Sequence, residues 1–151
     1  METNISILPA ASDHAQGVYA LMCELEGEEL DRQGFLRIFN ENLNNRDICY
    51  FVAIMNGCVA GFLSLHVQRL LHHAALIGEI QEIVVSHDCR GRGIGQALFE
   101  RIRIVAKDAG CVQLEVCCRK ERMRSFDFYQ KMGMICSHYK LCLPLPSDSA
   151  G

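Results

Sequence analysis

A glycine-rich turn at residues 90–95 is the stretch of this sequence whose residue types and spacing best suit chemistry. It reads Arg90-Gly91-Arg92-Gly93-Ile94-Gly95. The β-branched residues Ile83, Val84 and Val85 precede it and predict a buried strand, and apolar residues recurring every three or four positions after it predict a helix. Backbone N–H groups at such a helix N-terminus are unpaired and lie at the positive end of the helix dipole, so the turn can bind phosphate.

The spacing of these glycines excludes two common nucleotide-binding turns. The dinucleotide pattern G-x-G-x-x-G fails because its third glycine would fall on Gln96. The pattern G-x-x-x-x-G-K-[S/T] occurs nowhere in the chain. The residues alone leave two interpretations open, a phosphate ligand of another kind or a structural turn that binds nothing.

Two motifs of the chain resemble those of the GCN5-related N-acetyltransferase (GNAT) superfamily. The turn fits the pattern [Q/R]-x-x-G-x-[G/A] directly after the strand that the superfamily requires. Residues 128–134 resemble its F-Y-x-K-x-G-F segment, with Met134 where phenylalanine is usual. In that superfamily the turn holds the pyrophosphate of acetyl-coenzyme A (acetyl-CoA), so the resemblance implies acetyl-CoA as co-substrate.

The elements expected around these motifs give an α/β fold with a mixed sheet, in the GNAT-like order β-α-α-β-β-β-α-β-α-β. Asn56-Gly57 between two apolar runs is a strong hairpin signal and predicts two antiparallel strands. The expected strands cover residues 4–8, 48–55, 58–69, 79–85, 111–118 and 134–143. The expected helices begin near Ser12 and Asp31, at Ile94 and after Arg124, and the last two end at Gly110 and Gly133.

Length, charge and cysteine usage limit the function classes. The 151 residues fit one domain, which we expect at residues 1–146, with a disordered tail at 147–151. A net charge of −3 without a basic run disfavours nucleic-acid binding. The apolar runs are too short to span a membrane and no signal-peptide pattern is present, so we expect a cytoplasmic protein. Nine cysteines without a C-x-x-C pair indicate reduced thiols rather than a disulfide framework.

The likeness is closer to the bacterial aminoalkylphosphonate N-acetyltransferases. It is carried by residues 18–21, 39–43, 72–73, 77–82 and 128–129. This resemblance implies transfer of the acetyl group to the primary amine of a small aminoalkylphosphonate, such as 2-aminoethylphosphonate or 1-aminoethylphosphonate. Two alternatives stay open: a protein or peptide N-acetyltransferase, for which the acidic segment 24–31 would supply a patch, and a noncatalytic CoA-binding module.

Acetyl transfer to an amine needs a base for the ammonium group and an acid for the departing thiolate. A carboxylate on an apolar strand is a suitable base because desolvation raises its pKa, and Glu79 and Glu82 are candidates. Strand alternation puts them on opposite faces unless a bulge intervenes. The resemblance favours Glu79, keeps Glu115 in reserve, and implies that Tyr129 protonates the sulfur. The structural alternatives are an ion-paired carboxylate and a packed aromatic ring.

The resemblance also implies how the co-substrate binds. The backbone of Ile83, Val84 and Val85 would pair with the pantetheine amides. The pyrophosphate would lie on Arg90, Gly91, Arg92, Gly93, Ile94, Gly95 and Gln96, where the two arginines add charge-assisted hydrogen bonds. Many members carry asparagine seven residues before the tyrosine, whereas this chain has Arg122.

A phosphonate acceptor needs positive charge in its pocket. Arg32, Arg37 and Arg69 are candidate cations, and the histidines 66, 72 and 73 are candidate ligands of a divalent metal ion, which the resemblance associates with phosphonate acetylation. The alternative for the histidines is partly buried, hydrogen-bonded side chains. A small-molecule amine is the expected partner, and the last strand offers an edge that could pair in a homodimer.

Overall fold

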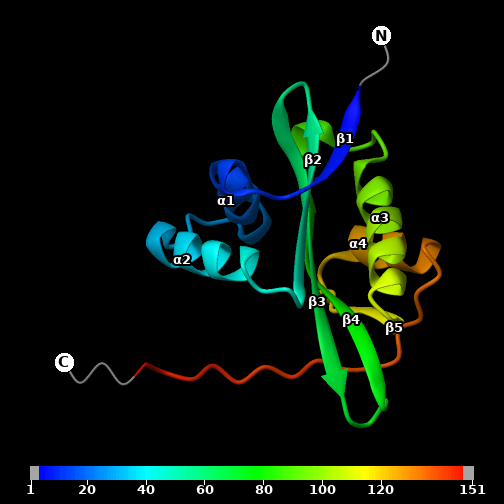
Figure 1. Ribbon diagram of the computed structural model, residues 1–151. Helices are drawn as coiled ribbons and strands as arrows, with labels where there is room; N and C mark the ends of the chain where they lie inside the picture. The colour runs from blue at the N-terminus through cyan, green and yellow to red at the C-terminus, as the bar shows by residue number, and fades with distance from the viewer. Residues whose placement is uncertain (1–3, 148–151) are drawn as a thin grey trace. The chain divides into compact units, whose positions relative to one another are not determined.

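The computed structural model describes residues 4–147, which form two compact units that meet in sequence between Val116 and Cys117 (Figure 1). Of the tail expected at 147–151, residues 148–151 lie outside the described part of the chain. The single domain expected over residues 1–146 stays a prediction. None of the helices within residues 4–147 is long and apolar enough to span a membrane.

The first unit contains a five-stranded sheet with strands in sequence order. Its strands are β1 (Ile5–Pro9), β2 (Ile48–Met55), β3 (Cys58–Leu70), β4 (Ala75–Val85) and β5 (Cys111–Val116). Neighbouring strands are antiparallel, except that β4 and β5 are parallel. The expected mixed α/β class is confirmed. The expected hairpin is confirmed as well, since Asn56 and Gly57 both have positive φ, as its tight turn requires.

Helices cover both faces of this sheet. Helices α1 (Ala15–Glu26) and α2 (Arg32–Leu43) lie on one face, and α3 (Ile94–Asp108) lies on the other (Figure 1). The core under α1 and α2 is continuous with three strands, where the buried residues are Val18, Leu21, Met22, Phe39, Val52, Phe62 and Val84. On the opposite face α3 approaches β3 so closely that a Cβ atom on Gly61 would lie 2.9 Å from Cγ2 of Ile94.

Local sequence determines where these helices begin and end. The Asp31 carboxylate accepts a hydrogen bond from Gly34 N at 3.0 Å and caps α2. Gly27 ends α1 with φ 73°, a left-handed conformation that favours glycine. Two short 3-10 turns precede helices, at Ser12–His14 and His87–Cys89. Ser12 therefore opens a turn, and α1 begins only at Ala15.

The second unit contains helix α4 (Met123–Lys131), and after it the expectation from sequence is wrong. Residues 134–143 do not form a strand, and the whole segment 134–147 is extended without regular structure. A strand is stable only when another strand pairs with its backbone groups, and within residues 4–147 none pairs with this segment. The expected element order is therefore confirmed up to α4, and its final strand is absent.

Candidate active site

A bulge in β4 determines which carboxylates share a face of the sheet. Ser64 pairs with Glu82 and Leu65 pairs with Ile80, so Gln81 is an extra residue without a partner on β3. Directly paired residues lie on the same face, and residues two apart on one strand also share a face. Because His66 pairs with Glu79, both glutamates lie on the face that carries Ser64. Strand alternation alone would put Glu79 and Glu82 on opposite faces, and the bulge at Gln81 brings them to the same face.

The third candidate carboxylate lies on the same face. Glu115 of β5 is in register with Glu79 on the neighbouring parallel strand. The Gln81 side chain donates to Oε1 of Glu79 at 2.9 Å, and the Gln113 side chain donates to Oε2 of Glu115 at 2.8 Å. Nε2 of His73 lies 4.0 Å from the same Oε2 atom. Two partly exposed carboxylates therefore stand side by side and are held by neutral amides.

Glu82 differs from the other two because a buried hydroxyl holds it. Ser64 is fully buried, its Oγ donates to the Glu82 carboxylate, and it accepts from the backbone N of Glu82 at 3.0 Å. Both bonds join β3 to β4 beside the bulge, which fixes the local geometry. The structure thus gives Glu82 a structural partner that sequence analysis missed. The available signal was a single serine inside the apolar run of residues 59–65.

Beyond the bulge, β4 is paired on one side only. Strand β5 pairs with residues Leu76 to Ile80 of β4, and this ladder ends at the pair Ile80 and Val116. Residues 82–85 of β4 still pair with β3. On the side facing away from β3, the backbone of Ile83, Val84 and Val85 has no strand partner within residues 4–147, so an extended chain of amides can pair there.

The glycine-rich turn follows directly and has the backbone geometry that anion binding needs. Gly91 and Gly93 have φ values of 77° and 79°, and a Cβ atom on either would meet no atom within 4 Å. Gly93 is the N-cap of α3, and the first intrahelical bond runs from Ala97 N to Gly93 O at 3.0 Å. The N–H groups of the first helical turn, at residues 94–96, therefore precede the intrahelical ladder.

The side chains of the turn divide into exposed and buried positions. Arg90, Arg92 and Gln96 are exposed, whereas Ile94 is buried in the core and can contribute only its backbone N–H. The start of the turn is fixed by helix α1, because the Glu24 carboxylate accepts from His87 N at 2.6 Å. An anion at this helix N-terminus would thus meet a backbone held to α1 by Glu24 and two exposed guanidinium groups.

Tyr129 lies in the second unit, on helix α4, and its ring is buried against Phe128. Burial raises the pKa of Tyr129 above its usual value; the Cys118 thiol raises it further, and Arg122 opposes the shift. The phenol therefore stays protonated throughout the neutral range, which a proton donor requires. Arg122 is the N-cap residue of the same helix.

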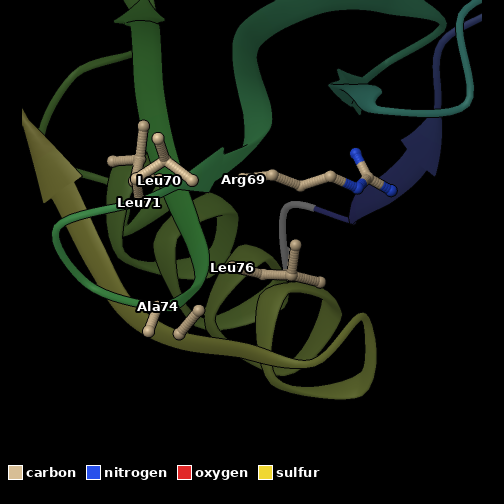
Figure 2. Close-up of a pocket in the computed structure, with 6 residues that line it drawn as sticks. Arg69, Leu70, Leu71, Ala74 and Leu76 are labelled. Carbon is tan, nitrogen blue, oxygen red and sulfur yellow. The ribbon is translucent and has the colours of Figure 1, made fainter.

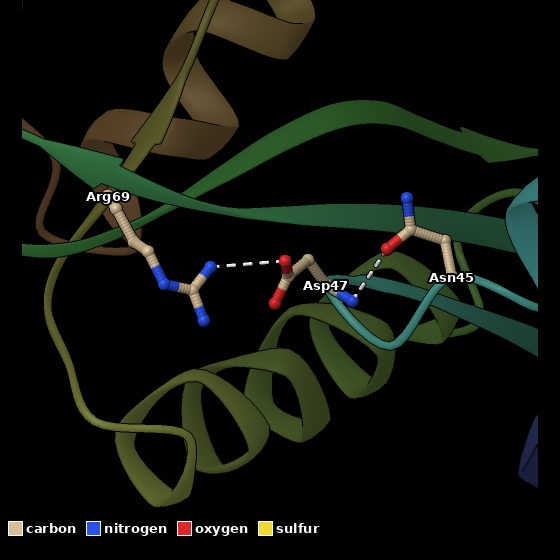
Figure 3. A network of polar contacts seen from close by, with 3 residues as sticks. All are labelled: Asn45, Asp47 and Arg69. Atoms are coloured by element: carbon tan, nitrogen blue, oxygen red, sulfur yellow. Dashed lines mark hydrogen bonds and ion pairs between the residues drawn. The ribbon is translucent and has the colours of Figure 1, made fainter.

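The candidate cations are largely engaged with other residues. The Arg69 guanidinium lies 3.1 Å from the carboxylate of Asp47 (Figure 3). The backbone N of Asp47 in turn donates to Oδ1 of Asn45 at 2.9 Å. The Arg32 guanidinium lies 4.6 Å from the centre of the Tyr19 ring and donates to Gln16 at 2.6 Å. Each could still contact an anion through its remaining N–H groups.

The candidate metal ligands do not form a binding set. The ring centres of His72 and His73 lie 4.4 Å apart with the ring planes tilted by 49°, but within residues 4–147 no group of three or more His, Cys, Asp or Glu side chains is arranged to hold a metal ion. Beside them, at the β3–β4 turn, lies a pocket of about 410 Å³ lined by Arg69, Leu70, Leu71, Ala74, Ala75 and Leu76 (Figure 2). Its lining is mainly apolar.

Comparison with known proteins decides the family. A sequence profile described as "Acetyltransferase (GNAT) family" matches residues 15–134. The chain belongs to the GNAT family. It is therefore an acetyl-CoA-dependent N-acetyltransferase, and both the open edge of β4 and the turn at 90–96 lie inside the matched region.

Two relatives indicate which acceptors occur among similar GNAT sequences. The aminoalkylphosphonate N-acetyltransferase of Salmonella typhimurium is 40% identical over 131 residues, covering 87% of this chain and 85% of that protein. A probable glucosamine 6-phosphate N-acetyltransferase of Drosophila melanogaster is 24% identical, covering 82% of this chain and 57% of that protein.

Solved structures confirm the GNAT fold. An aminoglycoside N-acetyltransferase, AAC(6')-Iy, in complex with CoA has a TM-score of 0.87 at 16% identity, covering 97% of this chain and 98% of that chain. A transcriptional regulator from Bacillus halodurans has the same TM-score at 20% identity, covering 94% and 100%. At such identities the likeness concerns the fold alone.

Proposed function

We propose that this GNAT enzyme acetylates the primary amine of a small aminoalkylphosphonate. The observation that carries the proposal is the 40% identity to the Salmonella aminoalkylphosphonate N-acetyltransferase, which extends over most of both chains. The relatives named for glucosamine 6-phosphate support a second candidate. Both acceptors combine a primary amine with a phosphorus-centred anion, so one type of pocket would serve either.

The co-substrate would lie along the open edge of β4. The pyrophosphate would accept hydrogen bonds from the backbone N–H groups at residues 91–96, with Arg90 and Arg92 adding charge. The pantetheine arm would pair with Ile83, Val84 and Val85. An extended arm that runs from the turn towards the bulge passes residues 81–85, about 17 Å of strand. Its thioester then ends beside Glu79.

Three features favour Glu79 as the base. It lies one residue before the point where β4 and β5 stop pairing, it faces the same side as Glu115, and its carboxylate accepts a hydrogen bond from the neutral amide of Gln81. Glu82 is held by Ser64 instead. Two adjacent carboxylates attract an ammonium group, and Glu79 would accept its proton directly or through water. Glu115 stays the reserve.

The proposed reaction proceeds by nucleophilic attack of the amine, collapse of a tetrahedral intermediate and proton transfer. The neutral amine nitrogen attacks the thioester carbonyl carbon, and the tetrahedral intermediate collapses as the bond from carbon to sulfur breaks. The departing thiolate takes a proton from the Tyr129 phenol, which burial keeps protonated. The phenolate regains a proton from solvent. The nitrogen loses two protons in all, one from the ammonium group before the attack and one from the intermediate, and both leave through Glu79 to solvent.

An acceptor screen with acetyl-CoA tests the proposal by following release of the free CoA thiol. The acceptors are 2-aminoethylphosphonate, 1-aminoethylphosphonate, glucosamine 6-phosphate and a lysine peptide, and ethylamine serves as the matched compound without the anion. We expect kcat/KM for an aminoalkylphosphonate to exceed that for ethylamine at least about a hundredfold, because charge-assisted contacts to the anion are lost in ethylamine.

The other outcomes separate the alternatives. A higher kcat/KM for glucosamine 6-phosphate than for the aminoalkylphosphonates would show that the proposed acceptor is wrong, whereas the proposed acetyl transfer would still hold. Turnover with the peptide alone would favour the protein N-acetyltransferase. Retention of acetyl-CoA without turnover of any amine would leave a binding module and contradict the proposed reaction.

A further inference from the structure

A row of side chains crosses the sheet on the face that carries Glu79. From β2 to β5 the residues in register are Ile48, His66, Glu79 and Glu115. His66 is the direct neighbour of Glu79, so their Cβ atoms lie about 5 Å apart. The His66 imidazole is partly buried, and among residues 4–147 it forms no hydrogen bond or ion pair. Its ring nitrogens are therefore available to a ligand that lies beside Glu79.

Tyr50 places a second hydrogen-bond donor on this face. It pairs with Ser64, two residues before His66 on β3, so Tyr50 and His66 are diagonal neighbours about 7–8 Å apart. The Tyr50 hydroxyl accepts a hydrogen bond from the Asn42 side chain at 2.6 Å, which leaves its own proton for another acceptor. Burial raises the pKa of Tyr50, although the hydrogen bond from Asn42 opposes the shift, so the phenol stays protonated at neutral pH.

Aromatic packing fixes the position of the Tyr50 ring. Phe39 of α2 stacks on it with ring centres 5.4 Å apart, and Phe62 of β3 contacts it edge-on at 5.1 Å. Tyr50 and Ile48 also line a cavity of about 220 Å³ at the C-terminal end of α2. Because Ile48 is the β2 partner of His66, this cavity borders the row. A small anion there would meet a phenol that is already oriented.

The chemistry of this face changes from one side of the sheet to the other. Strands β2 and β3 contribute the donors Tyr50 and His66, whereas β4 and β5 contribute the carboxylates of Glu79 and Glu115. An acceptor that carries both an ammonium group and an anion has the same polarity. Its ammonium group would lie at the carboxylates and its anion at the donors.

We propose that His66 and Tyr50 bind the anionic group of the acceptor while the amine of the acceptor lies at Glu79. This inference rests on the proposed acetylation of an amine that carries a phosphorus-centred anion. The anion would accept charge-assisted hydrogen bonds from the imidazole N–H and the phenol O–H. Neighbouring strands lie about 4.8 Å apart, a distance that one or two carbon atoms between amine and phosphorus can bridge. His66 and Tyr50 would thus determine specificity and take no part in proton transfer.

Titration of the full chain with methylphosphonate, which has the anion and no amine, tests this site without turnover. The histidine ring signals are followed by NMR, and the spectrum of His66→Leu assigns the signal of His66. We expect that signal to shift until the site is saturated. The Kd for methylphosphonate, measured from backbone amide shifts, should rise at least about tenfold in His66→Leu and in Tyr50→Phe, because each loses a charge-assisted hydrogen bond.

The matched control is His72→Leu, the same change at an exposed position of the β3–β4 turn outside the row. Its Kd for methylphosphonate should equal that of the natural protein. Tyr50→Phe removes a single oxygen atom, so it keeps the test decisive if His66→Leu does not fold. The inference is overturned if the His66 ring signal does not respond to methylphosphonate, if the folded variants bind it as the natural protein does, or if the control loses as much affinity as they do.

Kinetics separate this role from a structural one. The ratio of kcat/KM for 2-aminoethylphosphonate to kcat/KM for ethylamine should fall at least about tenfold in Tyr50→Phe, with most of the change in KM for the phosphonate. An equal loss for both acceptors would contradict the inference. If methylphosphonate binds at His66 but no aminoalkylphosphonate is acetylated, the proposed function fails and the anion site stands. If aminoalkylphosphonates are acetylated with an unchanged ratio in the variant, the anion site fails and the proposed function stands.

Discussion

Replacement of Gly93 by alanine tests whether the turn at residues 91–96 binds the pyrophosphate. Gly93 has φ 79°, and a Cβ atom there would meet no protein atom within 4 Å. The cost to folding is therefore conformational only, about 1–2 kcal/mol for a left-handed alanine. The same Cβ would stand in the space that we propose for the pyrophosphate and would displace one or two charge-assisted hydrogen bonds there. Each contributes about 1.5–3 kcal/mol, so we expect the Kd for acetyl-CoA to rise at least about tenfold.

Gly57 provides the matched control. It has φ 77°, its added Cβ would also meet nothing within 4 Å, and it lies in the β2–β3 turn. Gly57→Ala should lose the same free energy of unfolding in a urea titration and bind acetyl-CoA normally by calorimetry. If both variants bind acetyl-CoA equally well, the turn does not hold the pyrophosphate. If Gly93→Ala loses much more stability than Gly57→Ala, the reasoning about free space is wrong.

Three further predictions concern the carboxylates and the phenol. Ser64→Ala should lower the free energy of unfolding by about 1–3 kcal/mol in urea, because it removes a buried bond to Glu82; an unchanged value would deny Glu82 its structural role. Glu79→Gln should lower kcat about a hundredfold at neutral pH and Glu115→Gln much less, whereas the reverse order would exchange their roles. Tyr129→Phe should lower kcat by a similar factor. Because burial raises the folded pKa of Tyr129, its phenol ionises first in the unfolded chain, near pH 10, so the stability of the natural protein should fall relative to Tyr129→Phe only above that pH.

The sequence predicts those parts of the fold that depend on local signals. Asn56-Gly57 predicts the β2–β3 hairpin because few residues accept two positive φ values in succession. The turn is predicted by Gly91 and Gly93, because both positions have positive φ, which glycine accepts most readily. Helix α3 is predicted by the apolar residues that recur every three or four positions after the turn. The segment 134–143 shows the limit: its alternation predicts a strand, but whether a strand forms depends on a partner that the pattern does not contain.

The bulge at Gln81 shows why the site itself could be predicted only in part. Strand alternation separates Glu79 from Glu82, and one extra residue on β4, compensated by nothing on β3, brings both to one face with Glu115. No residue type in β4 marks that position, because the bulge is stabilised across strands, where Ser64 of β3 bonds both the backbone and the carboxylate of Glu82. The bulge lies where the β4–β5 ladder ends, so the irregularity that gathers the carboxylates is also adjacent to the open edge proposed for the pantetheine arm. A variant that moves the bulge should therefore impair acetyl-CoA binding and proton removal together, whereas Glu79→Gln should impair proton removal alone.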